Sequence, residues 1–355
     1  MLMKQLPVKS ANIKLLLLSA MHFATDGLCA YLIFARLYPE NEGLSLAVFI
    51  GYNMLAFVMQ APIGMLIDKL GRPKLFLTLS VILCIFGCLA SDICMLSVSL
   101  IGLGNAFFHV AGGKYVIDKS GNDIVHLGIF VSTGAVGLAL GQGYFEFKPI
   151  LHIFWAILIL CLLLLLFSKD PENRSVKETC TFEAGKAKAA LIAVIFAVLV
   201  RAFVGKVAHG DFEIMQITPL IIAVATALGK AFGGIATRLF GTVKTLTVSL
   251  AISALCLTLG TSNPIFYVIG VFSFNFSMPV TLYYANVLLK GSEGFAFGAL
   301  AATLLPGYLL ALPLSYDLWT KILVAILCAV CVIIIAIVSR GIRNHDPSAD
   351  FDPAD

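Results

Sequence analysis

The sequence predicts an all-α membrane protein that crosses the bilayer about twelve times, and two observations carry this prediction. Hydrophobic residues make up 60% of the 355 residues and charged residues only 12%, with a mean hydropathy of +0.98. A soluble domain carries roughly a quarter charged residues, so this chain lacks a soluble protein's surface. The second observation is that apolar runs of about twenty residues recur, each long enough to cross the hydrocarbon core. The runs at 157–167 and 322–338 do not alternate, which indicates helices and not barrel strands.

The expected helices follow one another with short connections. The first carries His22 and Asp26 and is too long for the hydrophobic region of a cleavable signal peptide. The nine cysteines lie mostly within apolar runs and are interpreted as packing residues, so we expect no metal and no cofactor. The expected spans are 13–37, 44–67, 74–91, 94–116, 125–145, 149–168, 187–206, 213–237, 243–261, 263–289, 293–314 and 318–340.

A polar stretch between the sixth and seventh spans divides the chain into two halves of six helices. We expect a first domain at 1–168, a cytoplasmic linker at 169–186, a second domain at 187–340 and a disordered cytoplasmic tail at 341–355. If the N-terminus lies inside, the inward-facing segments carry 18 of the 24 Lys and Arg residues, and the outward loops carry four. This asymmetry predicts that both termini are cytoplasmic, in a multi-pass protein of the cell (inner) membrane.

The two halves also resemble each other in sequence. Gly64, Gly71 and Lys74 after the second helix recur 170 residues later as Gly234, Gly241 and Lys244, while Arg238 stands where Asp68 would repeat. This offset predicts two parallel repeats of six helices, related by an axis along the membrane normal, an organisation found in one large class of transporters.

The loop after the second helix resembles the signature of the major facilitator superfamily, in the pattern Gly64-x-x-x-Asp68-Lys69-x-Gly71-Arg72. More loosely, His22-Phe-Ala-Thr-Asp26 and Gly102-x-Gly104-x-Ala106-x-Phe108-His109 are similar to the fosmidomycin-resistance-like branch of drug exporters. The resemblance implies the major facilitator fold, alternating access, and a central cavity surrounded by helices 1, 4, 7 and 10. It also implies that Asp68 and Arg72 hold the cytoplasmic side closed when the protein faces outward.

Ionisable residues at membrane depth are the candidate site, because an unpaired charge there costs several kcal/mol. Asp26 lies midway along the first helix with His22 one turn earlier on the same face, and Arg201 lies in the seventh helix. The implied cavity places Asp26 opposite Arg201. Two interpretations stay open: proton uptake by Asp26 breaks its pairing with Arg201, or the two form a static ion pair that fixes helix packing.

Further candidates lie in the fourth, eighth and tenth helices. Asn105 and His109 share one face of the fourth helix, where the imidazole suits proton exchange or a substrate hydrogen bond. Lys230 either reaches the interface or binds an anion in the cavity. Asn275 and Tyr283 flank Pro279, an expected kink, and either orient a polar substrate or pack between helices.

Together these features predict a secondary transporter that moves a small organic solute by alternating access, with protons as the coupling ion and export as one direction. The alternatives are an organic-anion uptake carrier or exchanger on the same fold, a non-transporting receptor or lipid scramblase, and a membrane enzyme built on His22, Asp26 and His109. No phosphate-binding loop for ATP is present. We expect a monomer in the lipid bilayer that is not an enzyme and has no nucleic-acid partner.

Overall fold

The computed structural model describes residues 6–142, 149–168, 184–210, 218–345 and 350–351, and within these ranges the regular structure is entirely helical. Eleven helical segments are long and apolar enough to cross a membrane, and α5, with 17 residues, is a shorter apolar helix. Each of the twelve expected spans therefore corresponds to one helix or one interrupted helix. The predicted fold class, a multi-span all-α membrane protein, is confirmed.

The first half of the chain supplies six crossings. Two are interrupted by π-helical turns, and the other four are single helices. In chain order the elements are α1 (Leu6–Ala30), η1 (Tyr31–Leu37), α2 (Tyr38–Glu40), η2 (Glu42–Leu44), α3 (Ser45–Asn53), η3 (Met54–Val58), α4 (Gln60–Leu70), α5 (Pro73–Leu89), α6 (Cys94–Ser120), α7 (Ile124–Gly141) and α8 (Ile150–Phe167).

The second half supplies the other six crossings, of which two are broken near their middle. Its elements are α9 (Ala184–Val207), α10 (Thr218–Phe240), α11 (Thr242–Leu259), α12 (Pro264–Phe274), α13 (Ser277–Leu288), α14 (Glu293–Ala302), α15 (Leu304–Ala311) and α16 (Leu318–His345).

Prolines account for three of the interruptions. A proline ring clashes with the carbonyl group four residues earlier and removes one hydrogen bond of the helix. Pro279 follows the break between α12 and α13, Pro306 follows the break between α14 and α15, and Pro62 follows the π-helical turn η3. The kink that the sequence predicts at Pro279 therefore lies just before the proline, where the strained carbonyl is.

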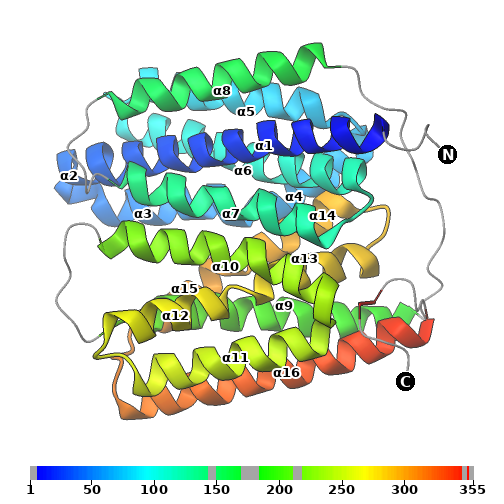
Figure 1. The fold of residues 1–355 in the computed structure, drawn as a ribbon. Helices are drawn as coiled ribbons and strands as arrows, with labels where there is room; N and C mark the ends of the chain where they lie inside the picture. Colours follow the sequence, from blue (N-terminus) through cyan, green and yellow to red (C-terminus); the bar gives the residue numbers. More distant parts are fainter. Residues whose placement is uncertain (1–5, 143–148, 169–183, 211–217, 346–349, 352–355) are drawn as a thin grey trace.

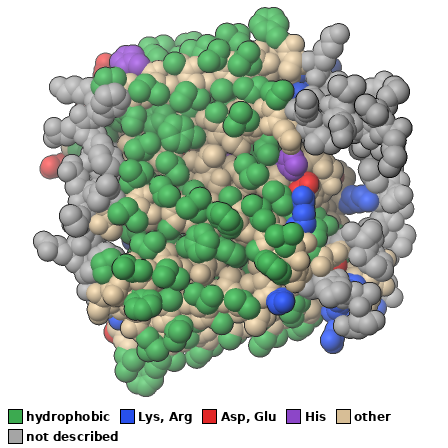
Figure 2. All heavy atoms as spheres, viewed as in Figure 1, with side chains coloured by type: hydrophobic (Ala, Val, Ile, Leu, Met, Phe, Trp, Pro, Cys, Tyr) green, Lys and Arg blue, Asp and Glu red, His purple; other side chains and the backbone are tan. Residues whose placement is uncertain are grey.

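The two halves of the chain form two adjacent groups of helices, α1–α8 and α9–α16, with α1 beginning and α16 ending at the same end of the molecule (Figure 1). Hydrophobic side chains cover most of the visible face, and most of the visible Lys and Arg side chains lie toward that end (Figure 2). Large apolar residues are exposed on the protein surface, among them Leu16, Phe167, Leu259 and Trp319. Such a surface is suited to contact with lipid and not with water.

The groups meet along two helix pairs, α4 with α14 and α7 with α10. Glycines make these contacts close. A Cβ atom added at Gly64 would overlap the backbone of Gly294, and one added at Gly298 would overlap the carbonyl group of Gln60. Small residues let helix backbones approach each other in a membrane, where apolar side chains gain little by leaving lipid. The two halves therefore touch through backbone along α4 and α14.

The end of the chain differs from the expected disordered tail. Helix α16 continues to His345, and Asp350 accepts hydrogen bonds from the Tyr284 hydroxyl at 2.9 Å and the Ser339 hydroxyl at 2.6 Å. The Phe351 ring packs on Tyr283 with 5.0 Å between ring centroids. Polar composition alone suggested solvation, but an acid that satisfies buried hydroxyl groups is held in place.

A second contact between the halves joins Asp123, which begins α7, to Arg238 near the end of α10. Burial opposes ionisation of the Asp123 carboxyl, but hydrogen bonds and positive charge from His126 and Arg238 outweigh it and hold its pKa below the ordinary range. The carboxylate also accepts hydrogen bonds from the backbone N–H groups of Val125 at 2.8 Å and His126 at 3.3 Å, which caps α7.

We expect Asp123→Asn to lower the melting temperature at pH 7 by about 2–4 °C, because the cap and the ion pair are weakened together. Since folding depresses this pKa, the stabilisation is complete well above the ordinary aspartate pKa of about 3.9 and is lost progressively as the pH falls from there toward the depressed value. Melting of the detergent-purified protein between pH 7 and pH 3 measures this. The exposed Asp92→Asn is the control, and equal melting of wild type and Asp123→Asn at pH 7 would contradict the prediction.

Candidate functional site: a charged cavity between the halves

A cavity with an empty volume of about 710 Å³ lies between the two groups of helices. Five of the residues singled out from the sequence line it: His22 and Asp26 from α1, His109 from α6, Arg201 from α9 and Lys230 from α10. One wall therefore carries an acid with two imidazoles, and the opposite wall carries two cationic side chains.

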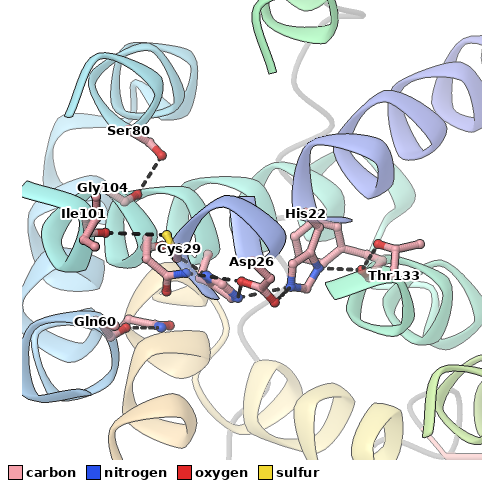
Figure 3. Close-up of polar contacts among 12 residues, drawn as sticks. His22, Asp26, Cys29, Gln60, Ser80, Ile101, Gly104 and Thr133 are labelled. Carbon is pink, nitrogen blue, oxygen red and sulfur yellow. Dashed lines mark hydrogen bonds and ion pairs between the residues drawn. The ribbon is translucent and has the colours of Figure 1, made fainter. Parts of the chain in front are cut away.

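The acid and the two imidazoles form one cluster. The Asp26 carboxylate lies 3.3 Å from His22 Nε2 and 3.4 Å from His109 Nε2, and these two nitrogens are 3.0 Å apart. The Asn105 side-chain amide donates to Asp26 at 3.2 Å, so Asn105 supports the cluster without lining the cavity. Figure 3 shows His22 and Asp26 projecting side by side from α1 toward this group of polar contacts.

The second nitrogen of each imidazole determines its tautomer. His22 Nδ1 lies 2.7 Å from the carbonyl oxygen of Phe130, and His109 Nδ1 lies 3.0 Å from that of Asn105. A carbonyl oxygen only accepts, so each Nδ1 carries the hydrogen and donates it. Two neutral imidazoles would then face each other with lone pairs on both Nε2 atoms, 3.0 Å apart and beside a carboxylate. That separation is a hydrogen-bond distance, so the geometry is satisfied when one additional proton lies in the cluster.

The sequence suggested that Asp26 pairs with Arg201, and the structure differs on this point. The Asp26 carboxylate is engaged by His22, His109 and Asn105, all from its own half of the molecule. Within the described ranges, neither Arg201 nor Lys230 has an ion-pair partner within 4.0 Å, and Arg201 Nε is buried without a hydrogen bond. The nearer imidazoles satisfy the acid, which leaves the two cations facing the cavity.

Two candidates in the tenth helix lie elsewhere. The Asn275 side chain donates to the carbonyl oxygen of Val271 at 2.8 Å in the break after α12. Tyr283, in the middle of α13, makes tilted ring contacts with Tyr284 and Phe351. Neither lines the cavity, to which this crossing contributes Met278, Thr281 and Leu282 instead. The break before Pro279 interrupts the regular helical spacing of this crossing, so the cavity-facing residues of α13 cannot be extrapolated from α12 by sequence spacing alone.

At the end of the molecule where α4 finishes, the Asp68 carboxylate reaches from one half to the other. It accepts hydrogen bonds from the backbone N–H groups of Gly294 at 2.9 Å and Phe295 at 2.8 Å, at the first turn of α14. Lys114 of α6 lies 3.2 Å from Asp68 and 3.0 Å from Glu293. We refer to Asp68, Lys114, Glu293 and the first turn of α14 as the latch. The arrangement pairs an acid with the positive end of a helix dipole.

The remaining residues of the loop signature lie outside the latch. Lys69 and Arg72 are exposed, and Gly71 closes α4 in the left-handed conformation with φ of +64°. Arg72, expected to close this side together with Asp68, is replaced in that role by Lys114, which the buried end of α6 brings into contact with both halves. Lys114 and Glu293 were missed because their partners are 46 and 179 residues away in the chain.

No protein-family model matches the sequence, and no curated protein matches it either. By fold, the chain is similar to a crystal structure of a variant of FucP, the fucose:proton symporter of Escherichia coli, with a TM-score of 0.67 and 13% identity. It is also similar to a structure of FucP described as a major facilitator superfamily transporter in the outward conformation, with a TM-score of 0.68 and 14% identity. Both comparisons cover 93% of this chain and 99% of the other.

The chain therefore shares the fold of these FucP structures. At 13–14% identity the likeness extends to the fold alone, so what this chain carries is argued from its own site.

Proposed function

We propose that this protein is a secondary transporter that moves a small organic solute by alternating access and couples the movement to protons. The observation that carries the proposal is the cluster of Asp26, His22 and His109, which faces the cavity between the halves and whose geometry calls for one additional proton. Ionisable groups inside a membrane bundle commonly mark ion pathways and proton relays. The fold supports the proposal, since the similar FucP is described as a proton symporter.

The charges across the cavity suggest how the proton acts. With its additional proton, the cluster of one carboxylate and two imidazoles is neutral in sum. Without it, Asp26 presents a negative charge toward Lys230 and Arg201 on the opposite half, and Lys230 lies within electrostatic reach of both. Proton loss would thus attract the two cavity walls to each other, and proton uptake would release them. This differential interaction is what a coupling ion needs in order to shift a two-state equilibrium.

The latch also supports alternating access. Asp68 and Lys114 belong to the first half, whereas Glu293 and the first turn of α14 belong to the second. These contacts cannot persist if the halves separate at that end. We place this end in the cytoplasm, with both chain termini, in a monomeric protein of the cell membrane. The direction of transport is a further part of the proposal. The resemblance to the fosmidomycin-resistance-like branch favours export.

A metal ion is the competing occupant of the cluster, because the ligand atoms of His22, Asp26 and His109 lie within 4.8 Å of one another. Zinc binds imidazole nitrogens at 2.0–2.1 Å in tetrahedral geometry, which separates two such nitrogens by about 3.3 Å. The observed 3.0 Å between the Nε2 atoms is shorter and is typical of a hydrogen bond. The geometry therefore favours a proton in this site.

The proposal is tested without knowledge of the solute by spin labels on non-natural residues at Leu70 and Lys290, both exposed near the latch. We expect the distance distribution between the labels to change when the pH falls from 8.5 to 5.5, because protonation shifts the equilibrium between closed and open states. The change should be absent in Asp26→Asn and present in the exposed Asp92→Asn. Distances that do not respond to pH in the wild type would refute proton coupling through this cluster.

A further inference from the structure

Arg201 and Lys230 are two cations without an acid. They line the same cavity from α9 and α10, two helices consecutive in the chain, and neither has an ion-pair partner within 4.0 Å in the part of the chain that the structure describes. The guanidinium Nε of Arg201 is fully buried without a hydrogen bond. A cation at membrane depth is expensive unless it is paired or hydrated. Two unpaired cations in one cavity, which also repel each other, therefore indicate a missing negative partner.

That partner is not the acid across the cavity. Asp26 already interacts with His22 and His109, and it accepts a hydrogen bond from Asn105. An arginine and a lysine that served only to hold the two halves together would be expected to contact Asp26 directly. Instead the negative charge is satisfied on one wall, and the positive charge of the opposite wall is directed into an open space.

We infer that the transported solute is an organic anion, whose acid group binds between Arg201 and Lys230. The inference rests on the proposed transport function and names its substrate class. A guanidinium presents a planar fork of donors that matches a carboxylate or phosphonate, and an ammonium group adds a point charge beside it. Two cations suit an acid group with more than one negative oxygen, or a solute with two acid groups.

The side chains that line the rest of the cavity indicate the chemistry of the part of the solute that lies beyond its acid group. Apart from the charged residues, the two histidines, Gln60 and Thr281, the lining is apolar and includes Phe57, Val198, Leu282 and Phe297. Burial of apolar surface against these side chains stabilises a ligand by about 25 cal/mol per Å². The site therefore fits an amphipathic anion, with an acid group at the cationic wall and an apolar body along Phe57 and Phe297. A strongly hydrophilic polyol would leave much of this lining unmatched.

The location of the anion site also connects it with the proton. The anion would bind to the second half of the molecule, and the proton is held by the first half. An anion between the cations would screen them from Asp26, so that the attraction between the two walls would depend on both ligands. Their cavity positions thus favour coupled movement of an anion and a proton, with less net charge crossing the membrane than for the anion alone.

The test compares probes that share a phenyl ring and differ in the charge of their polar group. Melting of the purified protein is measured with benzoate, phenylsuccinate, phenylphosphonate, benzyl alcohol and benzylamine, since a ligand of the folded state raises the melting temperature by mass action. We expect at least one of the three anions to stabilise the protein more than benzyl alcohol or benzylamine. The apparent Kd of that anion should rise at least tenfold in Arg201→Gln and in Lys230→Gln. Arg201→Lys, which keeps the charge, should recover part of the loss.

Lys188→Gln, an exposed substitution on the same helix as Arg201, is the matched control and should bind like wild type. The inference is overturned if benzylamine or benzyl alcohol stabilises as well as the anions, if no anion stabilises the protein, or if both cavity variants bind the anion like wild type. If no anion stabilises the protein while the label distances still respond to pH through Asp26, the organic-anion substrate is refuted and the proposed function stands. Anion binding through Arg201 without any pH response would instead remove proton coupling and keep the anion site.

Discussion

Asp26→Asn is expected to reduce solute-driven proton flux by about 100-fold or more. Removal of one partner from a buried charged group costs about 3–5 kcal/mol, and each 1.4 kcal/mol is tenfold in an equilibrium. An asparagine keeps the size of the side chain and a contact with Asn105, but it cannot offset a protonated His22 or His109, both of which lie within 3.4 Å of the carboxylate. The additional proton of the cluster is therefore lost, and the coupling with it.

Proteoliposomes that contain a pH-sensitive dye measure this flux when a solute gradient is imposed, with organic anions, cations and neutral solutes tested in turn. Exchange of labelled for unlabelled solute requires no net proton movement, so Asp26→Asn should retain it within a few-fold. Asp26→Glu should recover part of the proton flux, and the exposed Asp92→Asn should match wild type. Full proton flux in Asp26→Asn, or a wild type that moves solute without protons, would contradict the assignment.

The second large effect is expected at the latch, where Asp68→Asn should shift the protein toward the state that is open at this end. The variant loses the negative charge that two backbone N–H groups of α14 and Lys114 share. A hydrogen bond to a charged group contributes about 1.5–3 kcal/mol, and the charge at the helix N-terminus adds about 0.3–1 kcal/mol. A loss of about 3 kcal/mol changes the ratio of open to closed molecules by about 100-fold.

Asp118→Asn is a suitable control, because Asp118 also pairs with Lys114, at 3.6 Å, but from the same helix. It removes an acid from the same network without cutting a contact between the halves. Spin labels at Leu70 and Lys290 should report a longer distance in Asp68→Asn at pH 7.5 and the wild-type distance in Asp118→Asn. Equal distance distributions in both variants and the wild type would exclude Asp68 as a determinant of the closed state.

Much of the site could be located from the sequence because charge inside an apolar run is rare and visible without a structure. His22, Asp26, His109, Arg201 and Lys230 were identified on that ground, and the structure brings all five to one cavity. Their pairing could not be read in the same way. Which acid meets which base depends on helix rotation and on distances of a few ångströms, so the expected pair of Asp26 and Arg201 gives way to an interaction of Asp26 with two histidines.

The class of fold follows from the sequence, because the need to satisfy every backbone group in lipid turns each apolar run of sufficient length into a helix. Which side chains face one another depends on the tertiary structure. Tyr283, after the break at Asn275 and Phe276, does not line the cavity, and packing of α4 on α14 brings Asp68 to Gly294, 226 residues away. Hydrophobicity is a property of each segment, whereas helix rotation and partner choice arise only when all twelve crossings pack together.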